Sequence, residues 1–256
     1  MQKKSEFVQK ALIIFMLSLG AVTILYPLMW TTLASLKTRA EIVAIPGKLL
    51  PQEVQWINYK KVIHIISFAV AYKNSLIIAL IATTAVLVTS SIGGYAFAKL
   101  RFPGRDLIFL IILSTMMVPF FLGSIPLYVL MKWFGWLDSY YALIVPFVVS
   151  PFGIFLLRQF ILGIPDALVD SARLDGCSEF RVYWSIILPL AKPALGALAI
   201  FNFLWAWNDF FWPLLIIQSP KLYTIPIALS HLQIKSALSY ELISAGTVIS
   251  IVPVLI

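Results

Sequence analysis

Long apolar stretches alternate with short polar segments along the whole chain. A helix that crosses a bilayer needs ~20 apolar residues, whereas a strand of a membrane barrel needs ~10 residues of alternating polarity. The apolar stretches do not alternate, and they cover residues 11–36, 74–98, 107–130, 140–157, 194–217 and 241–256. The pattern therefore predicts an all-α polytopic membrane protein, with six transmembrane helices in a single domain over residues 1–256. Since the last stretch ends inside an apolar run, we expect a few further residues after it.

The composition agrees with a membrane protein. Hydrophobic residues make up 61 % of the chain and charged residues 12 %. Soluble domains average ~45–50 % apolar and ~25 % charged residues, so a soluble globule and a disordered chain are both excluded. Lysines and arginines that flank membrane helices explain the formal net charge of +8, and we expect no nucleic-acid partner. These basic residues divide almost evenly between the two sides of a six-helix topology, so charge leaves the orientation open.

The segment 158–193, between the fourth and fifth stretches, is predicted to form a helical hairpin. Pro165 followed by Asp166 is typical of a helix start, and Gly176 is typical of the turn after a helix end. Ser178 is suited to cap a second helix. Four apolar residues share one face of that second helix: Phe180, Tyr183, Trp184 and Ile187. A helix that merely lies on lipid is an alternative, but the acidic residues of the hairpin favour a protein partner.

The same loop resembles a known motif. Asp170–Gly176, followed after nine residues by Ile186–Pro189, is similar to the EAA loop of permease subunits in ATP-binding-cassette (ABC) importers. Asp170 and Ser171 stand in place of the glutamate and first alanine of that pattern. The resemblance implies a type I ABC importer permease fold, with a cytoplasmic N-terminus and a cytoplasmic 158–193 loop that docks on an ATPase subunit. The residues it assigns to ATPase coupling are Asp170, Ser171, Ala172, Asp175, Gly176, Phe180 and Pro189.

Other segments resemble the carbohydrate-uptake branch of that family, the maltose-transporter type: Gly94–Arg105, Ile125–Tyr128, Phe152–Phe160, Trp207–Phe210 and Pro220–Pro226. The resemblance implies the second, six-helix permease of a heterodimer in the cytoplasmic membrane, which imports a mono- or oligosaccharide. The implied partners are the other permease, an ATPase dimer that binds the ATP and magnesium, and an extracytoplasmic solute-binding protein. The outer loop near Lys235 and Ser236 is expected to contact the binding protein. A non-sugar solute, such as a glycerophosphodiester, is the nearest alternative cargo.

The chain has no recognisable catalytic or metal-binding motif, and no cofactor of its own is expected. Walker A, H-E-x-x-H and G-x-S-x-G patterns are absent. His64 and His231 fall on the outer side of the predicted topology and Cys177 on the inner side, which excludes a dyad or metal site built from them. An ion-coupled carrier is the remaining rival, and it would need ionisable groups inside the spans. Asp209 is the only charged residue well inside one, so a non-enzymatic subunit of an ATP-driven transporter is favoured.

Three polar or aromatic residues, Asn202, Trp205 and Asp209, fall on one face of the 194–217 helix. Because a carboxylate is costly in hydrocarbon, this face is either a wall of the translocation path or a contact between helices. Met116, close to Pro119, is predicted either to narrow the path or to pack as an ordinary core residue. A repeat of small residues on the second stretch favours close helix packing: Val86, Ser90, Gly94 and Ala98.

Overall fold

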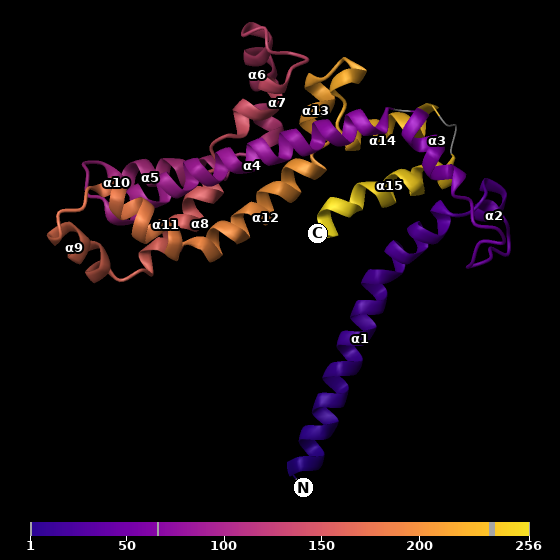
Figure 1. Ribbon diagram of the computed structural model, residues 1–256, viewed down its shortest axis with the longest axis horizontal. Coiled ribbons are helices and arrows are strands. Elements are labelled where there is room, and N and C mark those ends of the chain that lie inside the picture. The colour runs from indigo at the N-terminus through magenta and orange to yellow at the C-terminus, as the bar shows by residue number, and fades with distance from the viewer. Residues whose placement is uncertain (1, 66, 236–238, 256) are drawn as a thin grey trace. The chain divides into compact units, whose positions relative to one another are not determined.

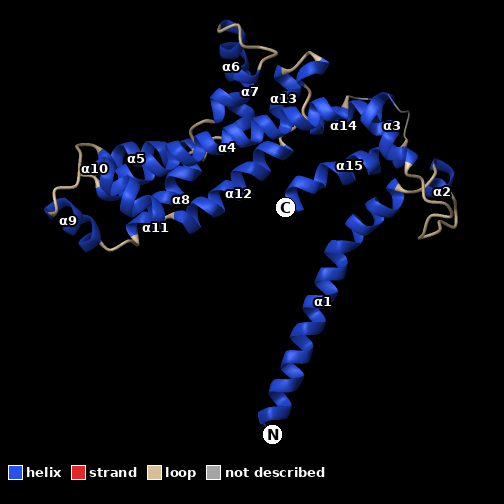
Figure 2. Ribbon diagram, in the orientation of Figure 1, coloured by secondary structure: helices blue, strands red, loops and turns tan. Residues whose placement is uncertain are grey.

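The computed structural model describes residues 2–65, 67–235 and 239–255, and in these residues it contains only helices, turns and loops (Figure 2). The predicted all-α class is therefore confirmed. Three helical segments are long and apolar enough to cross a membrane: Gln9–Ser35, Phe68–Lys99 and Tyr140–Leu162. Two further pairs of bent helices reach that length together, so the described chain is a polytopic membrane protein. The number of six spans stays a prediction, because the last helix, Tyr240–Leu255, has only 16 residues.

The chain divides into two compact units, Met1–Ala69 with Ala228–Ile256, and Val70–Ile227. The helices of the first unit are α1 (Gln2–Ser35), α2 (Arg39–Val43), α3 (Ile57–Ile65), α15 (Tyr240–Leu255) and most of α14 (Ile225–Lys235). Within this unit α15 contacts both α1 and α3. Every α1 side chain from residue 9 to residue 30 is exposed, including the apolar ones. Such a surface is expected of a helix that lies in lipid or against another subunit.

The second unit begins with most of α4 (Phe68–Lys99) and contains the predicted hairpin (Figure 1). Its other helices are α5 (Arg105–Thr115), α6 (Phe120–Trp133), α7 (Tyr140–Ile144), α8 (Pro151–Leu162), α9 (Asp166–Leu174), α10 (Glu179–Val182), α11 (Leu188–Leu190), α12 (Lys192–Asn208) and α13 (Phe211–Ile216). Short turns complete it: the 3₁₀ turns η1 (Val145–Phe147) and η3 (Pro220–Leu222), and the π-helical turn η2 (Tyr183–Ile187). Helix α8 contacts α5 and α12.

Prolines break two of the predicted spans. The 107–130 stretch forms α5 and α6, which are bent by 96°. Pro119 has no N–H, and its ring would clash with the carbonyl of Thr115, which is where α5 ends. The 194–217 stretch likewise ends its first helix at Asn208 and resumes at Phe211. Pro213 explains this break, because its ring would clash with the carbonyl of Asp209 in a continuous helix.

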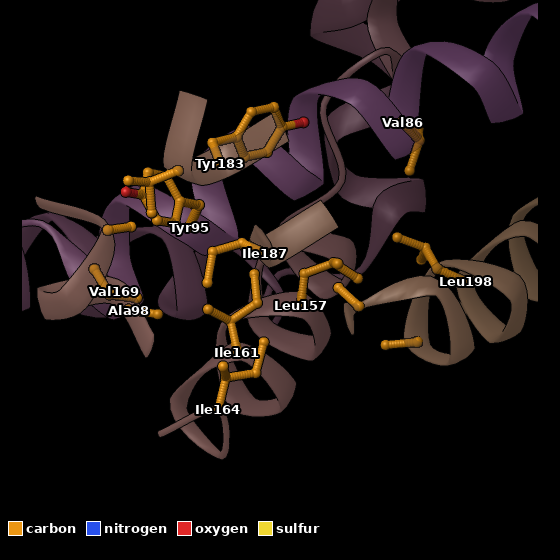
Figure 3. Close-up of a cluster of buried hydrophobic side chains, with 14 residues drawn as sticks. Val86, Tyr95, Ala98, Leu157, Ile161, Ile164, Val169, Tyr183, Ile187 and Leu198 are labelled. Atoms are coloured by element: carbon orange, nitrogen blue, oxygen red, sulfur yellow. The ribbon is translucent and has the colours of Figure 1, made fainter. Parts of the chain in front are cut away.

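The core of the second unit joins the hairpin to the long helices. Fourteen buried residues form one cluster with contributions from α4, α8, α9 and the α10–α12 segment. Figure 3 shows Ile187 and Leu157 near its centre, Val169 and Ala98 at one end, and Leu198 at the other. The predicted close packing of the small-residue repeat is confirmed at Gly94, where a Cβ would lie 2.7 Å from the Cβ of Leu157.

Candidate functional site

The hairpin has the start and end points that the sequence predicted. Helix α9 begins at Asp166, directly after Pro165. The turn after α9 contains Gly176 at φ +79°, a left-handed conformation that L-residues with a Cβ rarely adopt. The hydroxyl of Ser178 accepts a hydrogen bond from the Arg181 N–H and caps α10. Local side-chain and backbone preferences therefore determine the shape of this loop.

Helix α9 has one buried face and one exposed face. Val169 and Ala172, three residues apart, lie in the core of the unit. Ala167, Ser171 and Leu174 lie on the opposite face, and Leu174 is 89 % exposed. Ala172 packs against its own chain and does not lie on the exposed face of α9, so its predicted part in ATPase coupling stays a prediction. Leu174 was missed, although its spacing from Ala167 and Ser171 places the three on one helix face.

The remaining predicted coupling residues lie on the surface of the hairpin. Asp170, Ser171, Asp175, Gly176, Phe180 and Pro189 are all exposed. The predicted apolar face of the second helix is only half correct, since Tyr183 and Ile187 are buried while Phe180 and Trp184 are exposed. The π-helical turn at Tyr183–Ile187 accounts for the difference, because an i→i+5 turn changes the angular position of the residues around it.

Charged side chains connect the hairpin to the end of α4. Lys99 Nζ lies 2.5 Å from Asp166 Oδ1 and 2.6 Å from the carbonyl oxygen of Ile164. The hydrogen bond from the Lys99 ammonium holds the pKa of the Asp166 carboxyl below its ordinary value. Arg173 Nε donates to Glu179 Oε1 at 2.8 Å, and this bond is the main cause that lowers the pKa of Glu179. Both carboxylates therefore stay ionised at neutral pH.

A second candidate site lies where α8 begins beside α12. Asn202 and Trp205 line a cavity of about 440 Å³, together with Phe147, Ser150 and Phe201. The indole of Trp205 is half-exposed and contacts the ring of Phe147 edge-on, with 5.0 Å between the ring centres. The Asn202 side-chain amide donates to Thr83 Oγ1 at 3.2 Å. Phe147 was not predicted; the 3₁₀ turn around Pro146 brings it here.

Asp209 does not share the helix face of Asn202 and Trp205. Its backbone is extended, at φ −65° and ψ 120°, and α12 ends one residue before it. Its carboxylate accepts a hydrogen bond from the N–H of Trp212 at 3.4 Å. The predicted face is therefore wrong at this residue, because the helical periodicity stops at Asn208. Asp209 therefore bonds the backbone of the first turn of α13 at the buried Trp212, whose indole donates to the Ala142 carbonyl at 2.9 Å.

Met116 and Pro119 lie at the bend between α5 and α6. Met116 is exposed and is not among the residues that line the 440 Å³ cavity. Pro119 is the N-cap of α6, and Phe120 is the first residue of that helix. The centre of the Phe120 ring lies 5.7 Å from the centre of the Phe147 ring and 5.9 Å from the centre of the Trp212 ring. Of the residues at the bend, Phe120 therefore contacts the aromatic residues beside the cavity, and Met116 does not line the cavity.

The N-terminal part of α4 holds the segment between α13 and α14. The Asn74 amide donates to the carbonyls of Lys221 and Tyr223, at 2.9 and 3.0 Å. Asp138 Oδ1 accepts from the N–H groups of residues 218 and 219, at 3.0 and 2.9 Å. The side chain of Lys235 and the whole of Ser236 lie outside the described residues, so their predicted contact stays a prediction.

Replacing Gly176 by valine should loosen the hairpin. The described residues leave open space around a Cβ at this position, so the effect comes from the left-handed backbone alone and costs about 1–2 kcal/mol. Amide hydrogen exchange of α9 and α10 should then be roughly tenfold faster. Asparagine adopts the left-handed region more readily, so Gly176→Asn is the control and should have a smaller effect. Equal exchange in the wild type and the valine variant would contradict this account of the turn.

Comparison with known proteins gives a consistent result. Residues 85–256 match the family described as "Binding-protein-dependent transport system inner membrane component". The chain is 38 % identical over 251 residues to the arabinooligosaccharides transport system permease protein AraQ of Bacillus subtilis (strain 168), covering 96 % of this chain and 88 % of the relative. It is 33 % identical over 215 residues to the sn-glycerol-3-phosphate transport system permease protein UgpE of Yersinia enterocolitica, covering 82 % of this chain and 76 % of the relative.

A solved structure is similar over almost the whole chain. It is a chain of a bacterial ABC transporter involved in the import of the acidic polysaccharide alginate. The TM-score is 0.86 at 25 % sequence identity, covering 98 % of this chain and 94 % of the other.

Proposed function

Because the chain belongs to the family of binding-protein-dependent transport system inner membrane components, we propose that it is the permease subunit of an ATP-driven carbohydrate importer. The observation that supports this most directly is the hairpin, which is packed into the core through Val169 and Ala172 and exposes Ser171 and Leu174. A helix held in this way can receive force on its outer face and pass it to the helices beneath. Rigid-body movement of packed helices is one of the known modes of switching.

The proposed orientation follows from this role. The N-terminus and the 158–193 loop are cytoplasmic, where a separate ATPase dimer binds and hydrolyses ATP with magnesium. The outer face of α9, with Asp170, Ser171, Leu174 and Asp175, contacts that ATPase. Gly176, Phe180 and Pro189 shape the loop or border this surface. A second permease completes the membrane domain, and a solute-binding protein delivers the cargo to the segment between α13 and α15.

The cavity beside α12 supports a carbohydrate cargo. A sugar ring has apolar C–H faces and hydroxyl groups around its edge, which suit an aromatic ring face and an amide respectively. Trp205 and Asn202 provide these two groups in the 440 Å³ cavity. Two of the similar proteins are named as transporters of saccharides, one of arabinooligosaccharides and one of alginate.

A phosphate-bearing solute is a second candidate, because UgpE is named for sn-glycerol-3-phosphate. A phosphate group is usually bound by arginine, lysine or backbone N–H groups. Among the described residues that line the cavity there is no lysine or arginine, which favours the uncharged sugar over the phosphate.

Uptake should require ATP and not an ion gradient. The complex, purified with its native partners and reconstituted in vesicles with its binding protein, should accumulate a labelled oligosaccharide only when ATP reaches the ATPase. A protonophore should leave this uptake unchanged, because the described membrane helices do not contain a series of ionisable side chains that would relay protons. Labelled sn-glycerol-3-phosphate is the matched alternative cargo. Uptake that continues without ATP and collapses with the protonophore would overturn the ABC importer assignment.

A further inference from the structure

Three side chains from three helices meet where the hairpin touches α4. Tyr95 belongs to α4, Arg173 to α9 and Glu179 to the first position of α10. Glu179 accepts from Arg173 through both carboxylate oxygens, at 2.8 Å from Nε to Oε1 and 3.2 Å from Nη2 to Oε2. Its Oε2 also accepts a hydrogen bond from the Tyr95 hydroxyl. We call these three residues the Tyr95–Arg173–Glu179 bridge. It connects the end of the coupling helix to α4.

The start of α9 is connected to the same part of α4. Lys99, one helical turn after Tyr95, donates to Asp166 Oδ1 and to the Ile164 carbonyl. Arg173 Nη2 additionally lies 3.5 Å from the Lys99 carbonyl oxygen. Both ends of α9 are thus bonded to the last two turns of α4. Any displacement of α9 relative to α4 has to break or pull on these bonds.

Packing alone leaves a gap between α9 and this part of α4. A cavity of about 730 Å³ lies there, and Lys99, Arg101, Asp166, Asp170 and Arg173 are among its lining residues. Val169 of α9 and Ala98 of α4 also line this cavity, and both belong to the apolar core (Figure 3). Apolar contacts have little directional preference, whereas hydrogen bonds fix a geometry. The polar bridge therefore adds contacts of fixed geometry to the apolar packing between α9 and α4.

The ion pair within the bridge contributes little to the stability of the fold. The side chains of Arg173 and Glu179 are 37 % and 46 % exposed, and ion pairs at such positions are weak in water. A contact of small energetic value but defined geometry suggests a role in movement. Conservative changes can therefore remove the bridge while the helices stay packed.

We propose that Tyr95, Arg173 and Glu179 are positioning residues that pass the movement of the coupling helix α9 to the membrane helix α4. This inference rests on the proposed function, because it assumes that an ATPase moves α9. Through the bridge, the movement that ATP hydrolysis causes in α9 is passed to α4 and opens the permease. Without it, the ATPase would still bind and hydrolyse ATP, but fewer of its cycles would move cargo.

The test measures the number of ATP molecules hydrolysed for each cargo molecule imported. Tyr95→Phe removes only the hydroxyl, and Glu179→Gln keeps the side-chain shape while removing its charge. The matched control is Asp106→Asn, which removes an ion pair of similar length, 3.0 Å to Arg105, that does not involve α9. The complete transporter is reconstituted with its binding protein, and recovery of the ATPase with the tagged permease is measured in parallel.

We expect both bridge variants to recover the ATPase at the wild-type level and to use about fivefold more ATP for each cargo molecule, which is the low end of typical coupling between two sites. Asp106→Asn should match the wild type. An unchanged ratio in both bridge variants would overturn the inference, and so would a loss of ATPase recovery that fully accounts for the lost uptake. If the wild type itself showed no ATP-driven uptake, both the proposed function and the inference would be wrong. If the wild type showed ATP-driven uptake and both bridge variants used the wild-type amount of ATP for each cargo molecule, only the inference would be wrong.

Discussion

Replacing Leu174 by aspartate should detach the ATPase while leaving the permease folded. Leu174 is 89 % exposed, so an aspartate there costs the isolated permease little. On docking, the same position becomes buried under the proposed function, and an unpaired carboxylate is costly to desolvate. If Leu174 is a hot spot of this interface, its replacement costs about 2 kcal/mol or more, which corresponds to about 30-fold weaker binding. The measurement is recovery of the ATPase with the tagged permease in detergent, together with ATP-dependent uptake.

Ala172→Asp is the matched comparison on the other face of α9. Ala172 is buried in the core with Val169 and Ile187, so the carboxylate would be buried within the permease itself. We expect this variant to lower the yield and the thermal stability of the permease even without the ATPase. Leu174→Asp should change neither property. Full ATPase recovery with Leu174→Asp would place the docking surface elsewhere on the loop.

The shape of the hairpin was predictable because its signals are local. Pro165, Gly176 and Ser178 act through their own backbone and the next three residues, so no knowledge of tertiary packing is needed. The direction in which α9 faces was not predictable in the same way. Apolar residues lie on both of its faces, with Val169 on one and Leu174 on the other, so periodicity does not indicate which face is buried.

The path residues show a second limit of sequence reasoning. Asn202 and Trp205 were correctly placed together because both lie inside the continuous helix α12. Asp209 was misplaced because the prediction followed the hydrophobic stretch through to residue 217. Pro213 contained the missing signal, since a proline excludes helical hydrogen bonding to the residue four positions before it. Pro189 gives a similar signal for the π-helical turn at Tyr183–Ile187, since it excludes helical hydrogen bonding to Ser185 within that turn.

Replacing Gly94 by valine should prevent α4 and α8 from packing. A Cβ at Gly94 would lie 2.7 Å from the Leu157 Cβ and 3.0 Å from the backbone nitrogen of Arg158. These neighbours belong to the backbone or are attached directly to it, so a change of rotamer cannot move them away. The helices would have to separate, and overpacking of this kind typically costs 1–3 kcal/mol, with valine about at the upper end. Leu157 belongs to the 14-residue core that also contains residues of the hairpin, so separating the two helices would disturb that core as well.

Gly196→Val in α12 is the matched control, because the described residues leave open space within 4 Å of a Cβ there. Both variants place the same β-branched side chain in a helix, so their difference isolates the contact between α4 and α8. We expect Gly196→Val to purify with nearly wild-type yield and thermal stability. Gly94→Val should unfold at a temperature lower by several degrees, about 2–4 °C for each kcal/mol lost in a domain of this size. Equal unfolding temperatures for the two variants would show that α4 and α8 are not in the close contact on which the movement of the hairpin depends.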